Sequence, residues 1–126
     1  GVNVSSGSTI ETFTNSGTIQ SSNYGINVAA NANIKTLNNE SSGSIIASSA
    51  SANAINFAQG NSISTFLNQG TLIGGSNTSG VQVGVNNNGG ATIETFTNSG
   101  IIGNGISKFG VVVWGASTNK STINNF

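Results

Sequence analysis

The chain has 126 residues, of which 72 are Asn, Ser, Gly or Thr, and only 5% are charged. It contains no His, Cys, Asp or Arg, which excludes an ordinary zinc or copper site, a Ser–His nucleophile pair and thiol catalysis. Zero net charge without Arg argues against a nucleic-acid partner. We therefore expect no catalytic residue, no cofactor and no metal ligand, and predict a protein that is not an enzyme.

The first predicted strand covers residues 1–4, where two Val side chains flank an Asn. The motif consists of a small residue followed by a large apolar residue, a variable residue and a second large apolar residue. It recurs at residues 25–28, 54–57, 80–83 and 110–113. Successive copies begin 24, 29, 26 and 30 residues apart. Strict alternation predicts a strand with one buried face in every copy.

A second repeated element follows the opening motif. The nine residues 9–17 recur letter for letter at 92–100, with degenerate copies at 34–39 and 63–70 and a further start at 123–126. Differences in length between the copies fall in the Ser-, Asn- and Gly-rich segments between these elements. Fixed strands with variable loops are typical of a solenoid.

The second strand must bend to bury its apolar residues. Ile10 and Phe13 are three residues apart and cannot share a face of a straight strand, so we expect a corner or bulge near Glu11 and Thr12. A third short strand is predicted around Ile19 and its counterparts in later copies. Each repeat therefore contributes roughly three short strands.

These elements predict an all-β fold, a right-handed parallel β-helix of about 4.5 coils of 24–30 residues each. No stretch shows the 3.6-residue period of a helix. The coils are expected to start near residues 1, 25, 54, 80 and 110. We expect residues 1–126 to form a single segment of a longer repeat protein.

Equivalent residues lie above one another in such a stack, so the repeat predicts three ladders of inward side chains. The predicted ladders are Phe13, Leu37, Phe66, Phe96 and Phe126; Ile10, Ile34, Ile63, Ile93 and Ile123; and Asn15, Asn39, Asn68 and Asn98. Each amide of the Asn ladder is expected to bond to the coils above and below, which satisfies buried polar groups. Glu11 and Lys35 share one register in adjacent coils and are expected to form an outward ion pair.

The last opening motif contains a candidate contact patch. The patch comprises Phe109, Val112 and Trp114, the only Trp in the chain. If Val111 and Val113 point inward, Val112 and Trp114 point outward. Exposed aromatic clusters of this kind are typical of contact surfaces. The alternative is that the longer loop simply packs over its own coil. Tyr24, like Phe109, directly precedes an opening Gly. Instead of forming a contact surface, both rings could simply cover a corner of the coil.

The pattern Ile-x-Thr-Phe-x-Asn-x-Gly-Thr-Ile, which begins at Ile10, together with the Gly-Ile strand at Gly25, resembles repeats in passenger domains of bacterial autotransporters. The repeats are most similar to those of the vacuolating-cytotoxin-like group of Helicobacter and its relatives. The resemblance covers nearly the whole chain. It implies a secreted or surface-anchored protein at the bacterial outer surface, with a role in adhesion, colonisation or toxin delivery.

Three functions remain open on the sequence. The first is an extracellular structural and interaction module that meets a host-surface receptor or a glycan, with membrane contact only through an anchor outside this chain. The second is a filament subunit that self-associates end to end, because open β-helix ends expose unpaired strand edges. The third is a polysaccharide-active enzyme, which the scattered positions of Glu11, Glu40 and Glu94 argue against.

Overall fold

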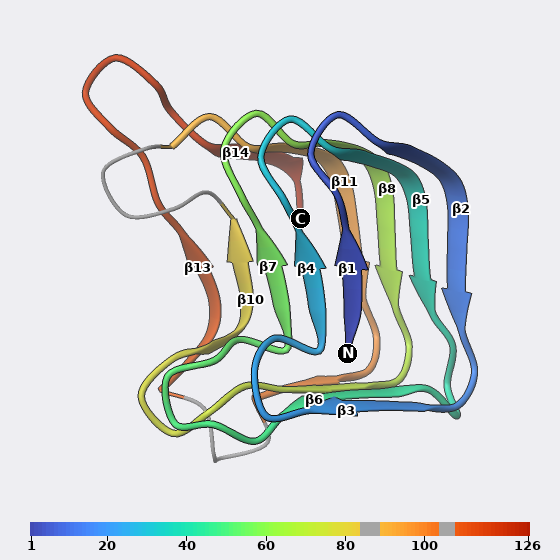
Figure 1. Cartoon of the computed structure of the whole chain (residues 1–126). Helices are drawn as coiled ribbons and strands as arrows, with labels where there is room; N and C mark the ends of the chain where they lie inside the picture. The colour runs from blue at the N-terminus through green and yellow to red at the C-terminus, as the bar shows by residue number, and fades with distance from the viewer. Residues whose placement is uncertain (84–88, 104–107) are drawn as a thin grey trace.

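The computed structural model describes residues 1–83, 89–103 and 108–126. All regular elements of these residues are β-strands, which wind coil upon coil around a common axis (Figure 1). Each of the first four coils contributes one strand to each of three sheets, the last coil contributes strands to two of them, and all neighbouring strands are parallel. The fold is an all-β parallel β-solenoid with three sheets, which confirms the parallel coil and the three strands per repeat predicted from the sequence.

The three sheets contain five, five and four strands. Sheet A comprises, in spatial order, β1 (Val2–Val4), β4 (Ile26–Val28), β7 (Ile55–Phe57), β10 (Ser79–Val83) and β13 (Phe109–Val113). Sheet B comprises β14 (Thr122–Asn125), β11 (Thr92–Asn98), β8 (Ser62–Asn68), β5 (Asn33–Asn39) and β2 (Thr9–Asn15). Sheet C comprises β12 (Ile101–Ile102), β9 (Thr71–Ile73), β6 (Ser44–Ala47) and β3 (Thr18–Ser21).

The register of the sheets follows the sequence repeat. In sheet B, Leu37 pairs with Phe13 in the preceding coil and with Phe66 in the following one, and Phe66 pairs in turn with Phe96. The opening motifs pair in the same way throughout sheet A. Residues of the same kind therefore occupy the same position in successive coils, and one packing arrangement serves the whole interior.

The long strands of sheet B bend between two buried residues. Ile63 and Phe66 are three apart on β8, and both are completely buried. Between β8 and β11, Ser64 and Glu94 are the only facing residues that do not pair, and both are exposed. This arrangement agrees with the corner or bulge expected near Glu11 and Thr12, because two successive exposed residues, Ser64 and Thr65, separate the two buried ones.

Aromatic rings contact one another within the core. Phe66 stacks on Phe96 with ring centroids 4.3 Å apart, and Phe57 meets Phe66 edge-on at 6.0 Å. All three rings are at most 1% exposed. Stacked and edge-on pairs of this kind each contribute about 0.5–1.5 kcal/mol beyond the burial of their area. The core is thus a continuous column that joins one coil to the next.

The outermost coils bury their ladder residues less completely. Ile10, Phe13 and Ile123 are partly buried and pack against the core, whereas Phe126 is 79% exposed. The ladder continues from Phe96 to Phe126, but the side chain of Phe126 is not covered there. Its ring meets Phe96 edge-on at 5.0 Å on one side, and no described coil covers the other side.

Candidate interaction surfaces

The predicted Asn ladder is present inside the corner between sheets B and C. Asn15 donates from Nδ2 to Oδ1 of Asn39 at 2.9 Å, Asn39 donates to Asn68 at 2.8 Å, and Asn68 donates to Asn98 at 2.7 Å. Asn39 and Asn68 are completely buried and Asn15 is 7% exposed, whereas Asn98, at the C-terminal end of the ladder, is exposed. The hydrogen bonds confirm the ladder. Because these amides bond to one another inside the protein, their role is structural.

A second contact sets the direction of the Asn ladder. Each amide also donates from Nδ2 to a backbone carbonyl in the turn that follows it, such as Asn15 to Gly17 at 3.0 Å and Asn68 to Gly70 at 3.3 Å. The carbonyl accepts only from the NH₂ group, so it fixes which end of the amide carries the nitrogen. Asn15, Asn39 and Asn68 therefore all donate toward the C-terminal coils.

The charged residues do not converge on one place. Lys35 pairs with Glu11 at 2.8 Å on the outside of sheet B, as predicted, and both side chains are more than half exposed. Glu94 accepts a hydrogen bond from Asn124 at 2.7 Å, three coils from Glu11. Three steps of ~4.8 Å separate these carboxylates by about 14 Å, beyond the spacing used in glycoside hydrolysis. Among the described residues, no three His, Cys, Asp or Glu side chains are grouped so that they could hold a metal ion.

A second column of amides lies on the outer face of sheet A. Asn27 donates to Asn3 at 2.8 Å, Asn56 donates to Asn27 at 2.8 Å, and Gln82 donates to Asn56 at 3.2 Å. We call these four residues the outer amide column. Its donors point toward the N-terminal coils, opposite to those of the buried Asn ladder. The column was not predicted, although the variable position of the first four opening motifs reads Asn, Asn, Asn and Gln.

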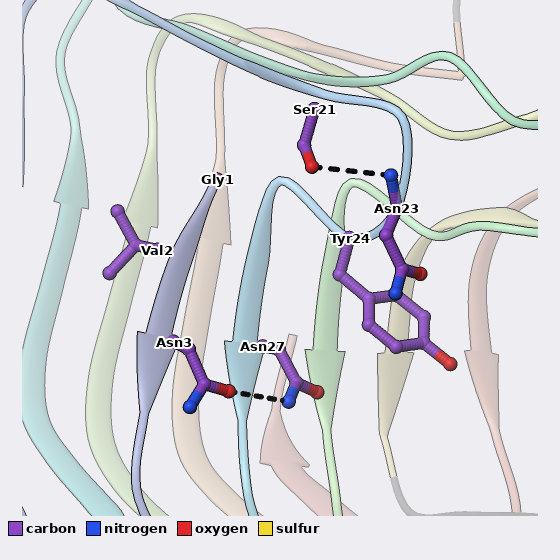
Figure 2. Close-up of a pocket in the computed structure, with 7 residues that line it drawn as sticks. All are labelled: Gly1, Val2, Asn3, Ser21, Asn23, Tyr24 and Asn27. Carbon is purple, nitrogen blue, oxygen red and sulfur yellow. Dashed lines mark hydrogen bonds between the residues drawn. The ribbon is translucent and has the colours of Figure 1, made fainter.

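The first of two hollows lies at the N-terminal end of the outer amide column. Figure 2 shows Tyr24 and Asn23 on the turn that leads into β4, beside the hydrogen-bonded side chains of Asn3 and Asn27. The turn is held by a hydrogen bond from the backbone N–H of Asn23 to Oγ of Ser21 at 3.2 Å. The hollow has a volume of about 270 Å³. This N-terminal hollow combines an amide floor with an aromatic side.

The second hollow, the C-terminal hollow, lies at the other end of the column and has a volume of about 140 Å³. The candidate patch residues Phe109, Val112 and Trp114 line it together with Asn53, Ser79 and Gln82. The structure thus brings the three predicted patch residues to one place. Of these three, Phe109 is 48% exposed and Trp114 is 37% exposed, whereas Val112 is half-buried.

Polar contacts hold the wall of the C-terminal hollow. Asn53 donates from Nδ2 to Oε1 of Gln82 at 3.0 Å and accepts from Oγ of Ser79 at 3.0 Å. On the aromatic side, Nζ of Lys108 lies 5.5 Å from the ring centroid of Phe109. Among the alternating residues of β13, Val111 packs against the core as expected, but Val113 is 44% exposed.

Comparisons with protein-family models, curated proteins and solved structures find no significant match to this chain. The part of the chain that the structure describes contains no helix of the length and apolar character needed to cross a membrane. The function is therefore inferred from the surfaces of the solenoid.

Proposed function

We propose that this chain is a non-enzymatic structural and interaction module, a right-handed β-helix segment of a secreted or surface-anchored passenger with an adhesin or toxin-like role. The observation that carries the proposal is the division between interior and exterior. The interior repeats from coil to coil, with Asn39 bonded to Asn15 and Asn68 and with Leu37 paired to Phe66. Such a stack is a rigid support, because each coil contacts its neighbours over all three sheets.

The exterior is where the coils differ. Tyr24 and Phe109 occupy one repeat position, where Asn53 and Ser79 stand in the other coils, and Trp114 takes the position of Ser5, Ala29 and Ala58. These aromatic residues line hollows on the outer side of sheet A or on the turns beside it. Side chains that vary on a regular scaffold are suited to recognition, as the loops of other rigid folds are. The outer surface also carries few charges, which favours contact with neutral, hydroxyl-rich or amide-rich partners.

The separated carboxylates support a function other than catalysis. Glu11 is neutralised by Lys35, and Glu94 is hydrogen-bonded to Asn124. Acid–base hydrolysis of a glycosidic bond requires two carboxyl groups on either side of one bond. Incubation of the full-length protein with neutral polysaccharides should therefore release no reducing ends, measured over many hours at several pH values.

The location is tested on cells that make the full-length protein. An antibody raised against the folded chain should label intact, unpermeabilised cells or the culture medium. An antibody against a cytoplasmic protein serves as the control and should label only lysed cells. If the antibody against this chain also requires lysis, the proposed surface or secreted function is refuted.

A further inference from the structure

The chain divides its aromatic residues between two environments. Phe57, Phe66 and Phe96 are the largest completely buried side chains and lie in the core. The only Tyr and the only Trp lie outside it, Tyr24 at the N-terminal hollow and Trp114 at the C-terminal hollow. Tyr and Trp combine an apolar ring with a polar group, which suits them to contacts at a wet interface.

The outer amide column connects these two aromatic positions. A primary amide offers two N–H donors and two acceptor lone pairs, and the column uses only one donor and one acceptor of each central residue. Asn3, at the N-terminal end, is exposed, and Asn27 and Gln82 are partly exposed, whereas Asn56 is 5% exposed between them. The column therefore presents spare donors and acceptors mainly at its two ends, beside the rings.

The spacing and the charge of this face restrict what it can bind. Asn27 and Val112, in the floors of the two hollows, are three coils apart, a distance of about 14 Å at ~4.8 Å per coil. Glu11 and Glu94 project from sheet B and do not line either hollow. Near the C-terminal hollow, Lys108 lies over the ring of Phe109. A ligand that fits both hollows must be extended, largely uncharged and able to alternate apolar faces with hydrogen-bonding groups.

We propose that the outer face of sheet A binds a neutral linear oligosaccharide whose chain runs along the solenoid axis from the N-terminal hollow to the C-terminal hollow. The C–H face of one sugar ring lies against Tyr24, and that of another lies against Trp114. The hydroxyl groups exchange hydrogen bonds with the exposed amides of the column. This inference rests on the proposed interaction function and names the chemical class of its ligand.

The single Trp provides a direct measurement of binding. The protein is titrated with cellohexaose, chitohexaose, maltohexaose and mannohexaose, and with the disaccharide of each series, while the fluorescence of Trp114 is followed. We expect at least one hexasaccharide to change the fluorescence saturably. Its disaccharide should bind at least about tenfold more weakly, because it cannot reach both hollows.

A variant at the opposite end of the column tests whether one ligand spans both hollows. Tyr24→Ala should weaken binding of the hexasaccharide about tenfold, still read from the fluorescence of Trp114, and leave the affinity for the disaccharide unchanged. Thr12→Ala, at an exposed position on sheet B, is the matched control and should bind the hexasaccharide like the original chain. Equal thermal midpoints of the three proteins would show that Tyr24→Ala retains the fold.

Several results would overturn this proposal. One is the absence of binding to every neutral hexasaccharide at millimolar concentration, and another is a Tyr24→Ala variant that binds the hexasaccharide normally. Tighter binding of hexagalacturonate, lost on Lys108→Gln, would show an acidic ligand instead. None of these results affects the labelling of intact cells, so failure of the glycan proposal is distinguishable from failure of the surface function.

Discussion

Asn39 and Asn68 are bonded side chain to side chain at 2.8 Å although both are completely buried and lie 29 residues apart in sequence. Asn39 also accepts from Asn15, so it is held from both neighbouring coils. A buried amide is tolerated only when its polar atoms have partners, and here the partners come from the repeat itself. The ladder therefore makes the correct register of the coils a condition of stability.

Replacement of a ladder residue should destabilise the solenoid strongly. Asn39→Ala removes the acceptor of Asn15 and the donor to Asn68, and leaves buried polar atoms without their partners. We expect the free energy of unfolding to fall by about 2–5 kcal/mol, measured by urea denaturation.

The neighbouring residue is a matched control for this prediction. Asn38 is on the opposite side of β5, and its Oδ1 is buried without a hydrogen-bond partner. Asn38→Ala removes an unsatisfied atom and should change the stability by less than about 0.5 kcal/mol. Similar losses in the two variants would contradict a structural role for the ladder.

Gly70 should tolerate no side chain, whereas Gly17, at the same position of the first repeat, should tolerate one. A Cβ atom at Gly70 would meet the backbone carbonyls of Gly43 and Glu40 in the preceding coil, whereas nothing lies within 4 Å of one at Gly17. Gly70→Ala should lower the free energy of unfolding by at least about 1–3 kcal/mol, because the coils must separate.

The corresponding change at Gly17 should be harmless. Gly17→Ala should be neutral or stabilise by up to about 1 kcal/mol, because it restricts the unfolded chain. Thermal unfolding of both variants is the measurement. If Gly17→Ala proved as harmful as Gly70→Ala, the backbone conformation of the turn, rather than close contact between coils, would explain why Gly recurs at this position.

The aromatic column should contribute more to stability than any exposed residue of the same strand. Phe66→Ala removes a ring that stacks on Phe96 and meets Phe57 edge-on, so we expect a loss of about 3–5 kcal/mol. Ser64→Ala, at an exposed position of β8, should stay within about 0.5 kcal/mol of the original chain. Denaturant midpoints that coincide for the two variants would show that the column is not the core.

Much of the interior could be predicted from the sequence, for a physical reason. In a parallel stack, residues at equal positions of the repeat lie above one another, so the recurrence of Asn15 at Asn39 implies contact. The same logic predicted the ion pair of Glu11 and Lys35, because their register is shared. It does not predict the exposure of Phe126, since periodicity assigns a side to a residue but does not state whether another coil covers it.

The candidate binding face depended on the tertiary structure. The alternation of the opening strand already placed Asn3 outward. The sequence does not predict the hydrogen bonds that join Asn27, Asn56 and Gln82, nor their direction opposite to the buried ladder. Tyr24 comes from a turn and Trp114 follows a strand, and no repeat relates them.

The amino-acid sequence by itself determined the solenoid, its register and most of its core, because those depend on contacts between equivalent residues of neighbouring coils. Only the tertiary structure decided that Tyr24 and Trp114 lie beside opposite ends of one amide column, each in its own hollow. The path of the turns brings them there, and turns of unequal length carry no periodic pattern from which their course can be read.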